Sequence, residues 1–308
     1  MDAARKPAWK RGLHSLVHSS NPLWLLARIG ILVYIGSLVL MMLFENKLIF
    51  FPSRYPQGDW NIATRSGEDG RVVGVIEDVN LTDADGVAIH GWFCVPHRIQ
   101  DGTPVPVDAD MTLLIFHGNA GNLSDRRHLI EHLLQLNANI LMCDYPGYGR
   151  SEGSPTEAGL YRTADAAWSH LTEGRGIDPK RIIIFGKSLG GAPAVKLAVR
   201  VHAAGLITES TFTSIPDMCN SAYPFIPRFI VRNQMNTISR IGDVSGPKLF
   251  IHGSRDAVIP YWMGERLFEA AAEPKQFYKI DNAGHNDTYE VGGDTYIDTL
   301  RAFIETCR

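Results

Sequence analysis

One short segment, residues 181–191, constrains the fold of this chain more than any other. An apolar run that ends at Phe185 leads directly into GKSLGG (residues 186–191), and a helix-like stretch of small and apolar residues follows. This arrangement matches the strand, turn and helix of the G-x-S-x-G motif. Glycine is needed on both sides because the serine backbone is strained and the strand and helix pack too closely for a Cβ atom. The segment therefore predicts a nucleophile at Ser188, against the alternative of an ordinary glycine-rich turn.

Strand-like and helix-like segments alternate along the rest of the chain. The strand-like runs are almost continuously apolar, as in strands buried on both faces, and right-handed crossovers then give a doubly wound, mostly parallel sheet. We therefore expect an α/β fold preceded by a hairpin, residues 72–81 and 87–95, that turns near Gly86. The other expected strands are residues 111–116, 138–142, 181–185, 204–208, 248–252 and 276–280, and the expected helices are residues 125–136, 156–171, 192–201, 263–271 and 289–305.

Two loops follow expected strands at the edge where open α/β sheets place their sites. The first, HGNAGN (residues 117–122), is rich in small residues, so backbone amides can point inward toward a developing oxyanion. The amides of Asn119 and Leu189 are the predicted donors, and His117 is interpreted as a buried hydrogen-bonding residue. The second, DYPGYGRS (residues 144–151), is interpreted as structural, with Asp144 bonded to nearby backbone and its aromatic residues lining a pocket mouth.

An acid and a base follow two later strands. Asp256 comes after the expected strand at residues 248–252, and His285 comes after the last one. A carboxylate at this edge can accept the Nδ1 proton of an imidazole, which sets the tautomer and stabilises the imidazolium. Asp256 is therefore the predicted acid, rather than a turn or helix-capping residue, and His285 the predicted base, in the order Ser188, Asp256, His285. Glu209 is the competing acid and otherwise supports nearby loops.

The first 50 residues differ in composition from the rest. Residues 23–44 carry a single charge, Arg28. At about 1.5 Å per residue they are long enough as a helix to cross a hydrocarbon core of about 30 Å. We expect an uncleaved transmembrane anchor at 23–44, rather than a signal peptide or a buried helix, because the apolar stretch is long and lacks a small-residue cleavage site. Residues 1–22 then form a cytoplasmic tail, residues 45–74 an irregular tether, and residues 75–308 the catalytic domain.

Positive charge predicts the orientation of this anchor. The positive-inside rule places the N-terminus in the cytoplasm and the catalytic domain outside it, on the periplasmic side in a bacterium. Four basic residues precede the apolar segment and two follow it closely: Arg5, Lys6, Lys10 and Arg11 before, Lys47 and Arg54 after.

The composition argues against several other classes of protein. The formal net charge is -3 with both signs interspersed, so the chain lacks the basic field of a nucleic-acid-binding protein. The four cysteines are scattered without C-x-x-C spacing, which indicates neither a zinc site nor a dense disulfide framework, and leaves a single disulfide open. No metal or cofactor is predicted, and the oligomeric state is left open.

In combination these motifs resemble those of the α/β-hydrolase superfamily, in particular the membrane-anchored serine hydrolases of the bud-emergence (Bem) type and the α/β-hydrolase domain proteins. The resemblance covers residues 76–304 and rests on FHGNAGN (116–122), DYPGYG (144–149), GKSLGG (186–191), IHGSRD (251–256), Gly284-His285 and the N-terminal apolar segment. It implies an α/β-hydrolase fold with Ser188, Asp256 and His285 as a catalytic triad. Depalmitoylases of this superfamily rely on an N-terminal cysteine cluster, and no cysteine precedes Cys94, which argues against a cytoplasmic depalmitoylase.

Residues 209–247 contain many apolar side chains and are expected to form a small helical lid. An apolar lid beside a membrane anchor suits acyl esters, so the expected substrate is a small or lipid-like carboxylic ester or thioester. Arg228, Arg232 and Arg240 are expected to face solvent rather than an anionic leaving group. Two other hypotheses stay open, a serine peptidase on the same fold and a membrane-anchored scaffold without catalysis.

Overall fold

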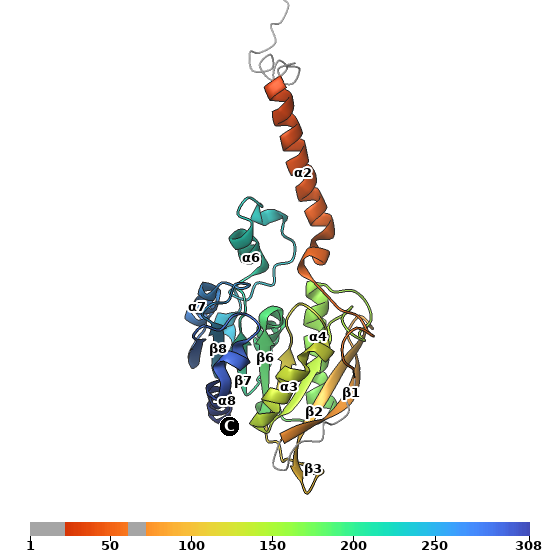
Figure 1. The fold of residues 1–308 in the computed structure, drawn as a ribbon, viewed down its shortest axis with the longest axis vertical. Helices are drawn as coiled ribbons and strands as arrows, with labels where there is room; N and C mark the ends of the chain where they lie inside the picture. The colour runs from red at the N-terminus through yellow and green to blue at the C-terminus, as the bar shows by residue number, and fades with distance from the viewer. Residues whose placement is uncertain (1–21, 61–71) are drawn as a thin grey trace, which may run out of the picture. The chain divides into compact units, whose positions relative to one another are not determined.

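The computed structural model describes residues 22–60 and 72–308, which divide into a unit that ends at Glu45 and a unit from Asn46 to Arg308. The larger unit has helices on both sides of a sheet (Figure 1). Its strands are β1 (Val72–Thr82), β2 (Ala88–Gln100), β3 (Thr103–Pro106), β4 (Thr112–Phe116), β5 (Asn139–Cys143), β6 (Ile182–Lys187), β7 (Gly205–Glu209), β8 (Lys248–Gly253) and β9 (Lys275–Ile280).

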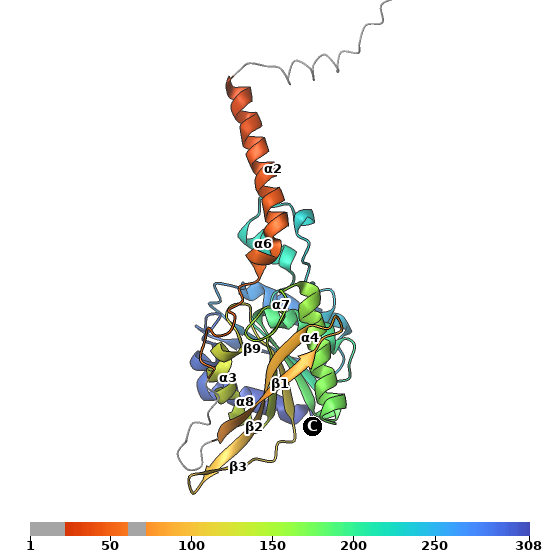
Figure 2. The same cartoon turned by 90° about the vertical axis from the view of Figure 1, so that its right-hand side faces the viewer.

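The described residues form a nine-stranded sheet in the order β1-β2-β5-β4-β6-β7-β8-β9, with β3 paired to β2. Strands β1, β2 and β3 pair antiparallel, β2 joins β5 antiparallel, and all neighbours from β5 to β9 are parallel. The predicted doubly wound, mostly parallel sheet is confirmed. Strand β3 pairs with the end of β2 opposite the turn at Gly86 and protrudes from the sheet (Figure 2). It was not predicted because Pro104 and Pro106 argue against a strand, although an exposed edge tolerates them.

The helices of the larger unit cover both faces of the sheet. Successive side chains of a strand point to opposite faces, so each face has its own hydrophobic core to be covered. The helices are α3 (Arg127–Leu133), α4 (Glu157–Ser169), α5 (Gly191–Ala198), α6 (Ile215–Ala222), α7 (Tyr261–Ala270) and α8 (Thr288–Thr306). Ile182 and Ile184 of β6 belong to a cluster with residues of α4, α5 and α7, whereas Ile183 and Phe185 belong to a second cluster with residues of α3 and α8. The helix expected at residues 125–136 is divided, with 3₁₀ turns on both sides of α3.

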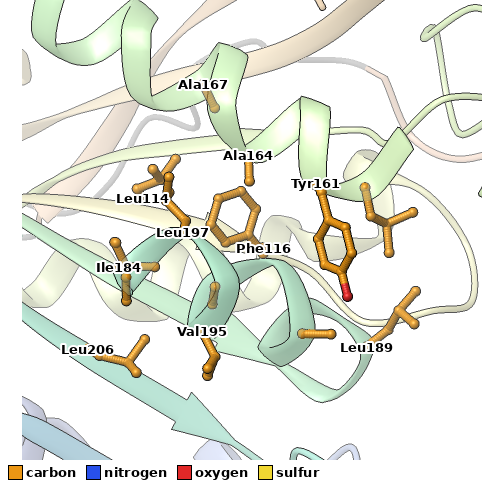
Figure 3. Packing of buried hydrophobic residues seen from close by; sticks show 14 of the residues in the cluster. Leu114, Phe116, Tyr161, Ala164, Ala167, Ile184, Leu189, Val195, Leu197 and Leu206 are labelled. Atoms are coloured by element: carbon orange, nitrogen blue, oxygen red, sulfur yellow. The ribbon is translucent and has the colours of Figure 1, made fainter. Parts of the chain in front are cut away.

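Helix α4 illustrates how a local signal and the core act together. The Thr156 side chain caps its first turn by accepting a hydrogen bond from the Gly159 N–H at 2.9 Å. Ala164 and Ala167 then lie on one face, at helical spacing, and pack toward Phe116 in the first cluster (Figure 3). Small side chains on this face let the helix lie close to the sheet.

Helix α2 (Pro22–Ile49) carries the apolar N-terminal segment. It has 28 residues, with a mean hydropathy of 2.2 over an 18-residue window of which none is buried. Such a helix is long and apolar enough to cross a membrane, and an N-terminal signal sequence passes the same test. The prediction of an irregular tether from residue 45 is wrong for residues 45–49, which continue helix α2 because residues 45–51 contain no proline or glycine. Residues 1–21 of the expected tail (1–22) and residues 61–71 of the expected tether (45–74) lie outside the described residues.

The segment expected to form a lid contains α6 and two 3₁₀ turns, Arg228–Ile230 and Ile241–Asp243. Three aromatic side chains in its middle are exposed, Tyr223 by 53%, Phe225 by 66% and Phe229 by 87%. Arg228 faces solvent as expected and pairs with Asp217 at 2.7 Å.

The expectation for Arg240 is wrong. Its guanidinium lies over the Tyr161 ring, 5.8 Å from the centroid, so it packs on the domain instead of facing solvent.

Candidate active site

Ser188 lies on the sharp turn between β6 and α5. Its φ is 55°, a left-handed conformation that is strained for any residue with a Cβ atom. A Cβ atom on Gly190 would lie 1.9 Å from the carbonyl oxygen of Phe116, and one on Gly186 would lie 2.6 Å from the Cβ of Ala194. The two glycines are therefore required by close packing, whereas the serine itself takes the strained conformation. The Ser188 side chain is held at the carboxyl edge of the sheet, and the residue is 8% exposed.

The structure brings Ser188, His285 and Asp256 together, although they come from three separate loops. The Ser188 Oγ lies 2.9 Å from His285 Nε2, and the His285 Nδ1 lies 2.7 Å from Asp256 Oδ2. Because an ionised carboxylate can only accept, Nδ1 carries the imidazole proton in this pair. The neutral Nε2 is then the acceptor for the Ser188 hydroxyl, as a general base must be.

Asp256 is fixed by its own loop and stays ionised. Its Oδ1 accepts hydrogen bonds from the N–H groups of Val258 and Ile259, each at 2.8 Å. Burial by itself would raise the pKa of the carboxyl, but hydrogen bonds from His252 and His285 hold that pKa well below its usual range. A carboxylate in this state stabilises an imidazolium at His285.

His252 is a neighbour of the site that the sequence did not single out. Its Nε2 lies 3.4 Å from Asp256 Oδ2 and donates to the Ile259 carbonyl at 3.0 Å. The ring is almost fully buried at the end of β8. A histidine within an apolar strand carries no pattern that separates it from a core residue, so only the packing of the loop after β8 reveals this contact.

Glu209, the competing acid, has other partners. Its carboxylate accepts hydrogen bonds from Lys187, from Thr288 Oγ1 at 2.5 Å and from Tyr296 OH at 2.6 Å. Burial would raise the pKa of Glu209, but the Lys187 ammonium and these hydrogen bonds lower it, so the side chain is an anion at neutral pH. Glu209 thus joins the residue before the nucleophile to the start of α8, while Asp256 bonds to His285.

The loop after β4 lies against the nucleophile. A Cβ atom on Gly118 would be 3.5 Å from the Cβ of Ser188, an ordinary van der Waals distance, so the backbone of this loop passes directly beside the serine. Within the described residues the backbone N–H of Asn119 makes no hydrogen bond. The N–H of Leu189 belongs to the first turn leading into α5, where N–H groups lack an intrahelical acceptor. Both predicted oxyanion donors are therefore backbone groups next to Ser188.

His117 and the second loop have structural environments. The His117 ring is 1% exposed, its Nδ1 donates to the Gly118 carbonyl at 2.7 Å, and burial lowers its pKa to about 4. Asp144 accepts a hydrogen bond from the Leu123 N–H at 2.8 Å, as expected for a residue bonded to backbone.

The expectation that aromatic residues of this loop line a pocket mouth is wrong for its two tyrosines. Tyr145 and Tyr148 are both 0% exposed. The Tyr145 hydroxyl donates to the His117 carbonyl at 2.8 Å, and the Tyr148 hydroxyl donates to Asn119 Oδ1 at 2.9 Å. A buried tyrosine needs a partner for its hydroxyl, and both find one on the loop after β4. The two tyrosines therefore help to hold the loop after β4 in place through their hydroxyl groups.

All four cysteines of the chain are free thiols, so the disulfide left open by the sequence is not formed. Cys94 and Cys143 are buried, and burial raises the pKa of both thiols, to about 12 for Cys94, so neither is a thiolate nucleophile. Among residues 22–60 and 72–308, no group of three or more His, Cys, Asp and Glu side chains is arranged to hold a metal ion.

Comparison with known proteins places the chain in a family. A family model described as the alpha/beta hydrolase fold matches residues 112–225. The chain is 35% identical over 279 residues to an uncharacterized protein of Mycobacterium tuberculosis, covering 90% of this chain and 93% of that protein. It is 32% identical over 299 residues to the alpha/beta hydrolase domain-containing protein WAV2 of Arabidopsis thaliana, covering 89% of this chain and 91% of that protein. The chain therefore belongs to the α/β-hydrolase family.

Solved structures agree on the fold. The esterase Pf2001 of Pyrococcus furiosus superposes with a TM-score of 0.63 at 19% identity, covering 83% of this chain and 98% of the esterase. At this identity the likeness defines the fold alone. The narrower resemblance to the bud-emergence type stays a prediction.

Proposed function

We propose that this protein is a serine hydrolase that cleaves carboxylic esters or thioesters through an acyl-enzyme intermediate on Ser188. The observation that carries the proposal is a pair of hydrogen bonds: Ser188 Oγ donates to His285 Nε2 at 2.9 Å, and His285 Nδ1 donates to Asp256 Oδ2 at 2.7 Å. Acyl transfer requires a nucleophile, a base within hydrogen-bond reach and a group that orients the base. Membership of the α/β-hydrolase family supports the same chemistry, and the fold shared with a P. furiosus esterase is compatible with it.

The residues act in a fixed order in this mechanism. Ser188 Oγ attacks the carbonyl carbon while its proton passes to His285 Nε2, and the negative oxygen of the tetrahedral intermediate is stabilised by the N–H groups of Asn119 and Leu189. Collapse of the intermediate breaks the bond to the leaving alcohol or thiol, which takes the proton from His285. Water then gives a proton to His285 and attacks the acyl carbon. The carboxylic acid departs, and Ser188 recovers its proton.

The proposed substrate is an acyl ester with an apolar chain, and the proposed partner is the membrane. The apolar stretch of helix α2 is long enough to cross a membrane and lacks a small-residue cleavage site, which favours an uncleaved anchor. Residues 223–229 expose three aromatic side chains, and aromatic residues are enriched at membrane interfaces. An enzyme held at a bilayer meets amphiphilic esters at high local concentration.

The activity is tested with the full-length chain in detergent micelles and p-nitrophenyl esters of rising acyl length. We expect hydrolysis with a preference for acyl chains longer than acetate, and covalent labelling by a fluorophosphonate probe that reacts with activated serines. Absence of both hydrolysis and labelling would point to a scaffold. Cleavage of peptide anilides without cleavage of esters would point to a peptidase.

The proposed topology gives a second prediction, with the domain outside the cytoplasm on an uncleaved span. Its basis is the excess of Lys and Arg before residue 23 over those shortly after residue 44. In a bacterial host, a C-terminal alkaline phosphatase fusion should be active and a green-fluorescent-protein fusion dark, because phosphatase is active only outside and the fluorophore matures mainly inside. Bright fluorescence with an inactive phosphatase would reverse the orientation without affecting the chemistry at Ser188.

A further inference from the structure

The segment that follows α2 runs across the loops of the active site. We call residues 50–57 the strap. It starts at Phe50, which is 3% exposed and packs in the first core cluster. The strap then pairs with the loop after β4, through hydrogen bonds from the Ser53 N–H to Gly121 O at 3.0 Å and from the Gly121 N–H to Phe51 O at 3.2 Å. It also pairs with the loop after β5, where the Tyr55 N–H donates to Gly149 O at 2.8 Å.

The side chain of Asn119 is held where the strap begins. Its Oδ1 accepts hydrogen bonds from the Phe51 N–H at 3.1 Å and from the Tyr148 hydroxyl at 2.9 Å, and its Nδ2 donates to the Ile49 carbonyl. The orientation of the amide is determined by its partners, because a backbone N–H can only donate and a carbonyl can only accept. These hydrogen bonds use both the donor and the acceptor end of the side chain on groups that belong to the rest of the domain.

The backbone N–H of the same residue is the predicted oxyanion donor. The Asn119 N–H makes no hydrogen bond within the described residues, and the preceding Gly118 packs against Ser188. An oxyanion donor acts only if its position is set within a few tenths of an ångström before the reaction, and a displacement of about 1 Å can cost on the order of 10²-fold in rate. A free loop rich in glycine cannot supply that rigidity by itself.

We propose that the Asn119 side chain is a positioning residue, clamped by Ile49, Phe51 and Tyr148 so that its own backbone N–H is held at the oxyanion position. The inference rests on the proposed hydrolase function. If Asn119 acts in this way, the strap is part of the active site, although the strap directly follows α2 in the sequence. The chain that leaves the apolar helix therefore helps to build the site, instead of serving only as a tether.

The test uses the full-length chain in detergent and two variants of the clamp. Asn119→Ala removes all three side-chain hydrogen bonds, and Tyr148→Phe removes one while keeping the aromatic packing. For a soluble p-nitrophenyl ester we expect kcat to fall about 10- to 100-fold in Asn119→Ala and less in Tyr148→Phe, with KM within about twofold of wild type, because the N–H acts on the transition state. The matched control is Asn233→Ala, which deletes another largely buried amide, bonded to Asn46 at 2.9 Å, and should retain wild-type kcat.

A second measurement separates positioning from general loosening of the fold. An alkylboronic acid forms a tetrahedral adduct with the serine oxygen and places a boron-bound oxygen at the oxyanion position. Its inhibition constant should rise in the two clamp variants by the same factor as kcat/KM falls, and should not change in Asn233→Ala. Unchanged kcat and unchanged inhibition in a folded Asn119→Ala would overturn the proposal, and Tyr148→Phe decides it if the alanine variant does not fold. An inactive wild-type protein would instead contradict the hydrolase function.

Discussion

Replacement of Ser188 by alanine is expected to lower kcat for p-nitrophenyl esters by about 10³-fold or more and to abolish labelling by a fluorophosphonate. In the proposed mechanism the hydroxyl oxygen forms the acyl-enzyme, and His285 Nε2, which lies 2.9 Å from it, is the proton acceptor. The fold should remain, because alanine carries the same Cβ atom in the same strained backbone. The thermal unfolding midpoint should therefore stay within about 3 °C of wild type.

A glycine at the same position provides the control for stability. Ser188 has a φ of 55°, a conformation that glycine adopts without strain. Ser188→Gly should be as inactive as Ser188→Ala and should unfold at a higher temperature, because the strain of about 1 kcal/mol is released. Ester hydrolysis near the wild-type rate by either purified variant would remove Ser188 from the mechanism.

Asp256→Asn is expected to reduce kcat by about 10³- to 10⁴-fold while the fold is kept. The amide oxygen can still accept from the N–H groups of Val258 and Ile259, so the loop is held as before. The amide nitrogen, however, would donate toward His285 Nδ1 and place the ring proton on Nε2. In that tautomer the imidazole cannot accept the proton of Ser188.

Glu209→Gln is the comparison that separates the two carboxylates. It removes the anion beside Lys187 but leaves the bond between His285 and Asp256, so kcat should fall by less than about tenfold. The unfolding midpoint should fall instead, because a largely buried lysine loses its charged partner. If Glu209→Gln lost more activity than Asp256→Asn at matched folding, the role of triad acid would move to Glu209.

The elements that sequence patterns predicted well are those determined by neighbours in the chain. Strand β6 and its turn can be read from an apolar run followed by glycines, and α4 from the spacing of its apolar residues after a capping threonine. The unpredicted strand β3 and the continuation of α2 to Ile49 are also local. Strand β3 forms against the propensity of its two prolines, whereas the continuation of α2 agrees with the helix propensities of residues 45–49. An exposed edge tolerates the prolines of β3, and residues 45–49 contain no helix breaker.

The contacts that complete the site join residues far apart in the sequence. Ser53 bonds to Gly121, and Phe51 to Asn119, because the chain after α2 crosses the carboxyl edge of the sheet. The burial of Tyr145 and Tyr148, and the approach of His252 to Asp256, depend on how whole loops pack. No periodicity in the sequence encodes such contacts, since each depends on the path of two separate segments.

The sequence by itself determined the α/β architecture, the strained turn at Ser188 and the order of the candidate nucleophile, acid and base, because these follow from local periodicity and from the common edge of parallel strands. It left Asp256 and Glu209 as rivals, since Glu209 ends one strand at that edge and Asp256 lies in the loop that follows another. Only the tertiary structure separated them. Glu209 is bonded to Lys187, Thr288 and Tyr296, whereas the loop after β8 brings Asp256 to His285. The physical reason is that each carboxylate bonds to the groups that chain packing places beside it, and these groups come from distant parts of the sequence.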